Sequence, residues 1–201
     1  NTAAQNGGAI YAEKTDIGSN PAATVTITGG IIGGDGTAGN KVTDHYGFGG
    51  GIFVNDGCIL TLDKYTDGSG NTHGTQIIGN EAGRAGGVRA NKSTVTMIGC
   101  TISGNKSTDT TNTGGGGGVY IHGNTSGRPI TMTDCTIQGN TAAGYGGGVC
   151  IEKGTANITN CTIKGNTAKF GGGIYARQLD SNASTVTISD NTIIGGTNTN
   201  D

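Results

Sequence analysis

The sequence is poor in the residues that build a conventional globular core. It contains no tryptophan, three phenylalanines and two prolines, and only 32% of its residues are hydrophobic. No apolar stretch approaches the roughly 20 residues that a helix needs to cross a bilayer, so we expect no direct membrane insertion of this segment. The first residues lack a methionine, a basic segment and an apolar segment, so we expect a mature or excised piece.

Charge and cysteine content exclude further classes of function. The formal net charge of −2 argues against a nucleic-acid partner, because binding the phosphate backbone requires an excess of Lys and Arg. Five cysteines is an odd number, and no Cys-x-x-Cys or His/Cys metal spacing occurs. Neither a paired disulfide framework nor a zinc site is indicated, and we expect no cofactor and no metal.

Glycine, by contrast, is abundant, with 42 residues, and composition alone would favour disorder. An internal repeat argues against disorder. A Gly-rich turn leads six times into a short apolar strand, at residues 7–11, 49–53, 86–89, 116–120, 146–150 and 171–175. A segment of period-two alternation follows each turn, at residues 24–28, 59–62, 94–97, 130–133, 156–159 and 185–188. A third short segment closes each repeat, at residues 31–34, 77–80, 100–105, 135–140, 161–166 and 193–196.

These segments predict an all-β chain that folds as a right-handed parallel β-helix, with about six coils of three short strands each. One coil cannot bury its apolar face, but stacked coils pair at roughly 4.8 Å and share a thin continuous core. We expect residues 1–201 to form a single repeat array, a fragment of a longer surface protein. Its partners then include neighbouring coils or domains of the same parent chain.

Equivalent positions of successive coils should stack into columns. Cys100, Cys135 and Cys161 share one column, which we interpret as packing rather than redox chemistry because Cys is commonly buried. A second column predicts an inward Asn ladder that satisfies turn amides; it contains Asn1, Asn80, Asn105, Asn140 and Asn166. Because Asn1 would close a preceding coil, we expect the array to begin in mid-repeat.

An outward column after the first inward residue of each repeat is the candidate binding site. Aromatic and Arg side chains are good contact residues for sugar rings or partner proteins, although cross-strand stacking alone also stabilises sheets. The column contains Cys150 and the candidate ligand-binding residues Tyr11, Phe53, Arg89, Tyr120 and Tyr175. A polar column beside it, predicted to be its solvated edge, contains Glu13, Asn55, Asn91, His122, Glu152 and Arg177. Phe48, Tyr145 and Phe170 form a further column, which we expect to fill the corner before the Gly triplets.

Two other features bear on function. An outward Thr column of the second strands resembles the ice-binding face of antifreeze solenoids, although Thr is also a common strand residue; it contains Thr26, Thr61, Thr96, Thr131 and Thr187, interrupted by Asn157. Insertions at turns are expected to carry recognition residues; they span residues 14–23, 35–45, 64–74, 108–114 and 123–128.

The Gly-Gly-Ala-Ile at residues 7–10, the Gly-Gly-Gly-[Val/Ile] turns and the Ile-x-x-Asn runs resemble the GGA[I/L/V] and FxxN repeats of the polymorphic outer membrane proteins. They are also similar to pectate-lyase-like β-helix repeats of bacterial adhesins. The sequence departs from the former pattern in having Ile for Phe and mostly Gly for Ala. The resemblance implies an extracellular bacterial cell-surface rod, secreted or displayed on the wall or outer membrane, whose partners are glycans or host or matrix proteins.

Carboxylates give little indication of catalysis. Glu13 and Glu152 share a column but have three coils between them, and Asp134 and Asp190 align two coils apart, about 10 Å at the solenoid spacing. We therefore predict an adhesin, binding or spacer β-helix that is not an enzyme and has no catalytic residues. The alternatives are a polysaccharide lyase or hydrolase of the pectate-lyase-like fold, and an ice-binding solenoid.

Overall fold

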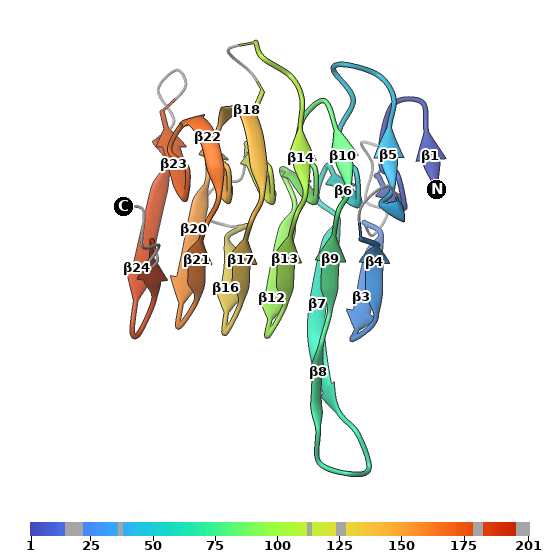
Figure 1. The fold of residues 1–201 in the computed structure, drawn as a ribbon, viewed down its shortest axis with the longest axis vertical. Helices are drawn as coiled ribbons and strands as arrows, with labels where there is room; N and C mark the ends of the chain where they lie inside the picture. Colours follow the sequence, from blue (N-terminus) through green and yellow to red (C-terminus); the bar gives the residue numbers. More distant parts are fainter. Residues whose placement is uncertain (15–21, 36–37, 112–113, 124–127, 179–182, 196–201) are drawn as a thin grey trace.

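The computed structural model describes residues 1–14, 22–35, 38–111, 114–123, 128–178 and 183–195. These residues form a parallel β-helix of about six coils, with the strands of successive coils lying side by side along the rod (Figure 1). The predicted fold class is confirmed, and the right-handed sense stays a prediction. No helix long or apolar enough to span a bilayer occurs in these residues.

Four sheets, rather than the three predicted, run the length of the rod. Sheet I contains the strands that follow the Gly turns: β2 (Ile10–Ala12), β6 (Ile52–Asn55), β11 (Val88–Asn91), β15 (Val119–His122), β19 (Val149–Glu152) and β23 (Ile174–Arg177). Sheet II contains the alternating segments: β3 (Thr24–Thr28), β7 (Ile59–Thr66), β12 (Thr94–Ile98), β16 (Ile130–Thr133), β20 (Thr155–Thr159) and β24 (Thr185–Ser189).

Sheet III contains the closing segments: β4 (Ile31–Gly33), β9 (Gln76–Ile78), β13 (Thr101–Ser103), β17 (Thr136–Gln138), β21 (Thr162–Lys164) and β25 (Ile193–Ile194). Sheet IV is the addition, and its strands lie between the Asn column and the Gly turns: β1 (Thr2–Ala3), β5 (Lys41–Val42), β10 (Glu81–Ala82), β14 (Lys106–Ser107), β18 (Thr141–Tyr145) and β22 (Thr167–Phe170). Several of these strands are only two residues long, too short for an alternation pattern to show in the sequence.

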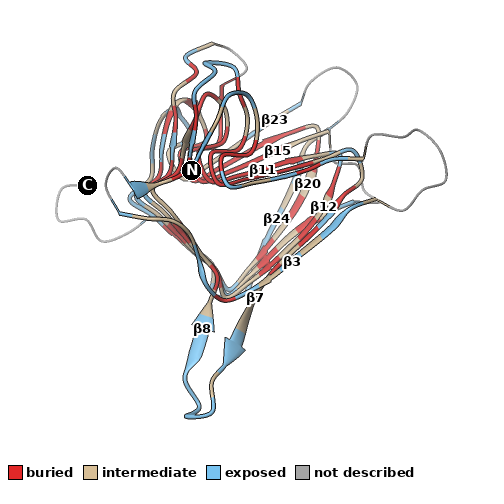
Figure 2. Ribbon diagram, turned by 90° about the vertical axis from the view of Figure 1, so that its right-hand side faces the viewer, coloured by how far each residue is buried: buried red, intermediate tan, exposed pale blue. Residues whose placement is uncertain are grey.

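Sheets I, II and III enclose the main core, seen end-on as a triangle in Figure 2. Its centre consists of one inward side chain above another, such as Ile102 on Ile137 on Ile163, all fully buried. The Cys column belongs to this core: Cys100, Cys135 and Cys161 are buried, and all five cysteines of the chain are free of disulfides. The packing interpretation of this column is confirmed.

The Asn ladder forms at the corner between sheets III and IV and extends through Asn40, which the sequence did not single out. Asn80 Nδ2 donates to Asn105 Oδ1 at 2.9 Å, and Asn105 Nδ2 donates to Asn140 Oδ1 at 3.0 Å. The backbone N–H of Asn105 also donates to Asn140 Oδ1 at 3.0 Å, and Asn105 Nδ2 donates to the Ile77 carbonyl at 2.8 Å. Each amide therefore satisfies polar groups of the coils on both sides.

A second lobe covers the outer face of sheet I. After the ladder the chain rises through sheet IV, curves over sheet I and returns through the Gly turn (Figure 2). The return begins with a residue in the left-handed region in each coil, for example Gly116 with φ of 70° and Gly146 with φ of 61°. In the third coil Ala85 holds this position with φ of 60°, a conformation that a Cβ disfavours. The backbone needs a positive φ where it turns back toward sheet I, and Gly adopts this conformation most easily, which explains why a Gly turn recurs in almost every coil.

One insertion lies mostly in described residues and forms a projecting hairpin. Strand β7 continues beyond sheet II and pairs antiparallel with β8 (Thr72–Gly74), so that the arm points away from the rod (Figure 1). At its tip Asp67 accepts bonds from His73, Asn71 and Ser69, which hold the pKa of its carboxyl down at about 2. Parts of the other four insertions, at residues 15–21, 36–37, 112–113 and 124–127, lie outside the described residues.

Replacing one ladder residue tests its energetic role. Asn105→Ala should lower the free energy of unfolding by roughly 3 kcal/mol, because the buried backbone N–H of Asn80 and the Ile77 carbonyl lose their side-chain partner and Asn140 Oδ1 loses one of its two donors. Urea denaturation followed by far-UV circular dichroism measures the loss. The control is Asn157→Ala, an outward position of β20, where a change within about 0.5 kcal/mol is expected. Equal effects of the two substitutions would contradict the ladder's role.

Candidate functional site

The predicted binding column is aligned as expected but is not an exposed surface. Tyr11, Phe53, Arg89, Tyr120, Cys150 and Tyr175 are paired in register along sheet I. However, Phe53 is 4% exposed, Arg89 6% and Tyr120 2%, because the second lobe closes over them. Only the ends of the column reach solvent, with Tyr11 42% exposed and Tyr175 partly buried. The expectation of a continuous exposed aromatic face is therefore wrong.

Within the lobe, Arg89 lies between aromatic rings. Its guanidinium carbon is 4.0 Å from the Phe48 ring centroid and 4.4 Å from that of Tyr120, distances at which the cation attracts the ring faces. Burial lowers the pKa of Arg89. Among the described residues its Nε and Nη1 have no hydrogen-bond partner.

The corner-filling prediction for Phe48 and Tyr145 is confirmed, since Tyr145 packs on Tyr175 at 4.6 Å between ring centroids. Phe170 stacks on Tyr145 but is itself 47% exposed.

The polar neighbours of this column are also engaged within the protein. Tyr120 Oη donates to Glu152 Oε2 at 2.6 Å, and Arg177 Nη2 lies 2.7 Å from Glu152 Oε1. Burial is the largest cause that raises the pKa of the Tyr120 hydroxyl. Glu152 is 1% exposed, so this carboxylate is inside the lobe rather than at the solvated edge that was predicted. Its negative charge pairs with the guanidinium of Arg177.

The rest of the polar column forms a hydrogen-bonded row. Asn55 Nδ2 donates to Glu13 Oε1 at 3.0 Å, Asn91 Nδ2 donates to Asn55 Oδ1 at 2.6 Å, and His122 Nδ1 lies 3.0 Å from Asn91 Oδ1. Burial, followed by the positive charge of Arg89, lowers the pKa of His122 to about 4. The imidazole is therefore neutral at physiological pH.

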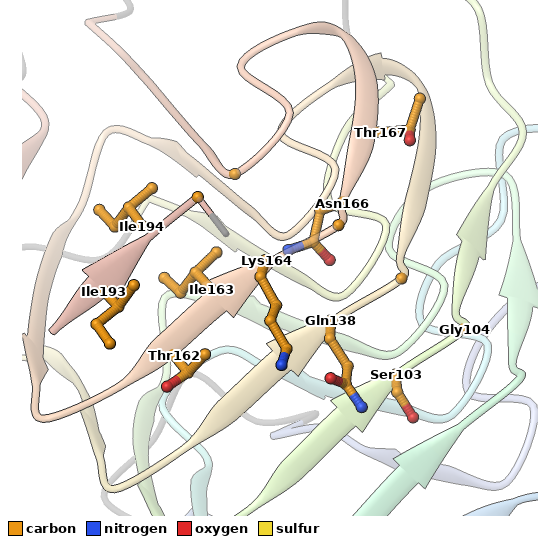
Figure 3. Close-up of a pocket in the computed structure, with 14 residues that line it drawn as sticks. Ser103, Gly104, Gln138, Thr162, Ile163, Lys164, Asn166, Thr167, Ile193 and Ile194 are labelled. Atoms are coloured by element: carbon orange, nitrogen blue, oxygen red, sulfur yellow. The ribbon is translucent and has the colours of Figure 1, made fainter. Parts of the chain in front are cut away.

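A groove beside the ladder corner, on the outer face of sheet III, is open to a ligand. It has a volume of about 1120 Å³, large enough for an oligosaccharide. Sheet III forms one wall, the start of sheet IV forms the other, and Gly-rich turns lie between them (Figure 3). The described lining residues are Ser103, Gly104, Gln138, Gly139, Thr162, Ile163, Lys164, Gly165, Asn166, Thr167, Gly173, Ile193, Ile194 and Gly195.

The polar side chains of the groove stand in a row. Ser103 pairs in register with Gln138, and Gln138 with Lys164, so that the three side chains follow one another along the rod on the outer face of sheet III (Figure 3). The Gly residues of the corner, Gly104, Gly139 and Gly165, have φ of 62°, 62° and 59° and add no side chain that would fill the groove. The result is a trough parallel to the axis of the solenoid, with this polar row along it and Ile193 and Ile194 of the last coil at one end.

The sequence contained a signal for this groove in its third strands. The outward residue of each third strand alternates with the buried Ile, and a Gly always precedes the ladder Asn in coils two to five. What the sequence could not reveal is sheet IV, whose rise at this corner makes the second wall.

The Thr column and the carboxylates, which were the other candidates from the sequence, do not come together into one site. The Thr column lies in register on sheet II, interrupted by Asn157 as predicted. Asp134 accepts from Asn160 Nδ2 at 2.7 Å and from Lys64 Nζ at 3.2 Å, so its charge is neutralised locally. Within the described ranges, no three His, Cys, Asp or Glu side chains lie close enough to hold a metal ion.

The depressed pKa of His122 predicts an acid-sensitive stability. An unfolded chain protonates His near pH 6.5 whereas the folded chain resists protonation down to about pH 4, so stability is lost as pH falls through this window. Because the imidazole is only partly buried, water screens part of this effect, and we expect a loss of about 1–2 kcal/mol from this group. His122→Asn, which matches Asn91 and Asn55 of the same column, should lack this component. Urea denaturation at pH 6.5 and 4.5 measures it, and the same pH dependence in both proteins would refute it.

Three segments of the repeat array are similar to a known repeat family. The family model described as the Chlamydia polymorphic membrane protein repeat matches residues 1–13, 134–152 and 160–177. Each matched segment includes a sheet IV strand, the Gly turn and a sheet I strand. Neither the curated proteins nor the solved structures include a match to this chain. The three matched segments of the β-solenoid are therefore similar to the repeat of the Chlamydia polymorphic membrane proteins.

Proposed function

We propose that this chain is the extracellular, non-enzymatic binding rod of a bacterial surface adhesin, and that the groove between sheets III and IV holds a glycan. The single observation that carries the proposal is the row of Ser103, Gln138 and Lys164 in an open groove of about 1120 Å³. Hydrogen-bonding side chains in such a row suit a ligand that is rich in hydroxyl groups.

The state of these side chains supports a role in binding. Within the part of the chain that the structure describes, the Ser103, Gln138 and Lys164 side chains have no hydrogen bond or ion pair with other side chains. By contrast, the polar groups of Tyr120, Glu152 and Arg177 are engaged with each other inside the lobe. A ligand in the groove would therefore gain new hydrogen bonds without breaking existing ones.

The repeat family supports surface display, since these repeats are found in outer-membrane and surface proteins. A stiff rod with ligand groups repeated on one side is a suitable shape for adhesion, because several weak contacts act together.

The composition of the groove also favours binding over catalysis. Glycoside hydrolysis requires two carboxyl groups about 5–9.5 Å apart. Among the described lining residues there is no Asp, Glu, His or Cys. The proposed activity is therefore recognition of a glycan rather than its cleavage.

A glycan array tests this function. The chain should bind at least one class of glycan, and the double variant Gln138→Ala with Thr162→Ala should weaken that binding about tenfold, since each lost hydrogen bond contributes about 0.5–1.5 kcal/mol. Binding constants for the best glycan are measured by isothermal titration calorimetry.

The matched control is Thr131→Ala, an outward position of sheet II in the same coil as Gln138, and its affinity should stay unchanged. A Tyr175→Ala variant examines the end of the predicted aromatic column. If Tyr175→Ala removes binding while the groove variant retains it, the ligand site is the column end and the groove proposal is wrong.

A further inference from the structure

We infer that the groove selects a linear glycan bearing carboxylate groups and holds it along the axis of the solenoid, with about one sugar per coil. This inference rests on the proposed function and specifies the ligand class and its orientation. Three features of the groove carry it: the spacing of its polar side chains, the sign of its charge and the absence of stacking groups from its described lining.

The spacing sets the orientation of the ligand. Strands of adjacent coils are about 4.8 Å apart, which is close to the length of one pyranose unit in an extended glycan. The lining begins at Ser103 on β13, continues through Gln138 on β17 and Lys164 on β21, and ends beside β25. It thus covers four coils, about 14 Å at this spacing. A glycan along the axis meets an equivalent position at every sugar, whereas a glycan across the axis soon leaves the groove.

The charge of the groove sets the class of the ligand. The exposed Lys164 is the one charged residue in the described lining, although the chain as a whole has a net charge of −2. Lys164 Nζ is not held by an ion pair with any described carboxylate. Its position in the row places a cation where one sugar of an axial glycan would lie, and an ammonium group favours a carboxylate there.

The wall formed by sheet IV adds positive charge in the same direction. Lys106 occupies the same column as Thr141 and the lining residue Thr167. Its neighbours in the column form a triad in which Glu81 lies 2.8 Å from Lys41 Nζ and 3.6 Å from Lys106 Nζ. Two Lys around one Glu leave one excess positive charge on sheet IV, beyond the end of the groove.

The kinds of side chain in the lining decide how a sugar is recognised. Neutral sugars are commonly held by stacking on aromatic rings, but the described lining contains no Phe, Tyr or Trp. Gln138 offers an amide that donates and accepts, and Thr162 offers a hydroxyl. Recognition therefore depends on hydrogen bonds and on the Lys164 charge, so removing the negative charge of a glycan should weaken its binding.

A pair of uronic acid tetrasaccharides tests the charge. Linear tetragalacturonate and its fully methyl-esterified form have the same backbone and differ in charge. Isothermal titration calorimetry at low salt should show the acid binding about fivefold more tightly than the ester. Lys164→Gln should weaken binding of the acid more than binding of the ester, so that the two bind with equal affinity.

The matched control is Lys92→Gln, which removes the same charge from the far corner of the rod, between β11 and β12, and should leave both affinities unchanged. Equal binding of acid and ester, or equal effects of the two Lys substitutions, would overturn the inference. A length series tests the orientation: affinity should rise from di- to tetragalacturonate and then level off, and no gain over this range would refute axial binding.

These outcomes separate the inference from the proposed function. If array glycans bind through Gln138 and Thr162 while tetragalacturonate does not bind, the ligand class is wrong and the groove remains the binding site. If no glycan binds in either experiment, both are wrong.

Discussion

Hydrogen bonding between equivalent residues of successive coils is the constraint on which the remaining structure depends. Parallel strands pair in register in all four sheets, and the Asn ladder continues this pairing through the corner between sheets III and IV, where the backbone turns. The corner residue must donate to one coil and accept from the next. Because the amide of Asn has both kinds of group on a short side chain, it fits this position in coil after coil.

The same register explains why the chain needs so few large hydrophobic residues. Each inward side chain lies on its equivalents, so one or two inward side chains per strand, with the Cys column beside them, complete a continuous core. The second lobe provides a smaller core on the outer face of sheet I, built from aromatic rings, Arg89 and the Tyr120–Glu152–Arg177 contacts. The lobe also decides which surfaces are open, because it covers one face of the rod and raises a wall beside another.

The candidate groove and the covered column thus both result from the segment of each coil that forms the second lobe. Where the segment after Asn140 leaves the corner, it opens a trough beside Gln138. Where it returns through Gly146, it encloses Tyr120 and Cys150. The aromatic residues that the lobe encloses therefore contribute to packing, whereas the polar residues of the third strands are open to solvent.

The sequence by itself determined the β-helix, the coil number, the registers of the columns and the buried Asn and Cys positions, since repeated residues at equivalent positions must stack. It also indicated the polymorphic membrane protein repeats. Only the tertiary structure decided which outward residues reach solvent. Alternation tells on which side of a strand Phe53, Arg89 and Tyr120 lie, but the cover over that side comes from two-residue strands such as Lys106–Ser107, which are too short to have a pattern.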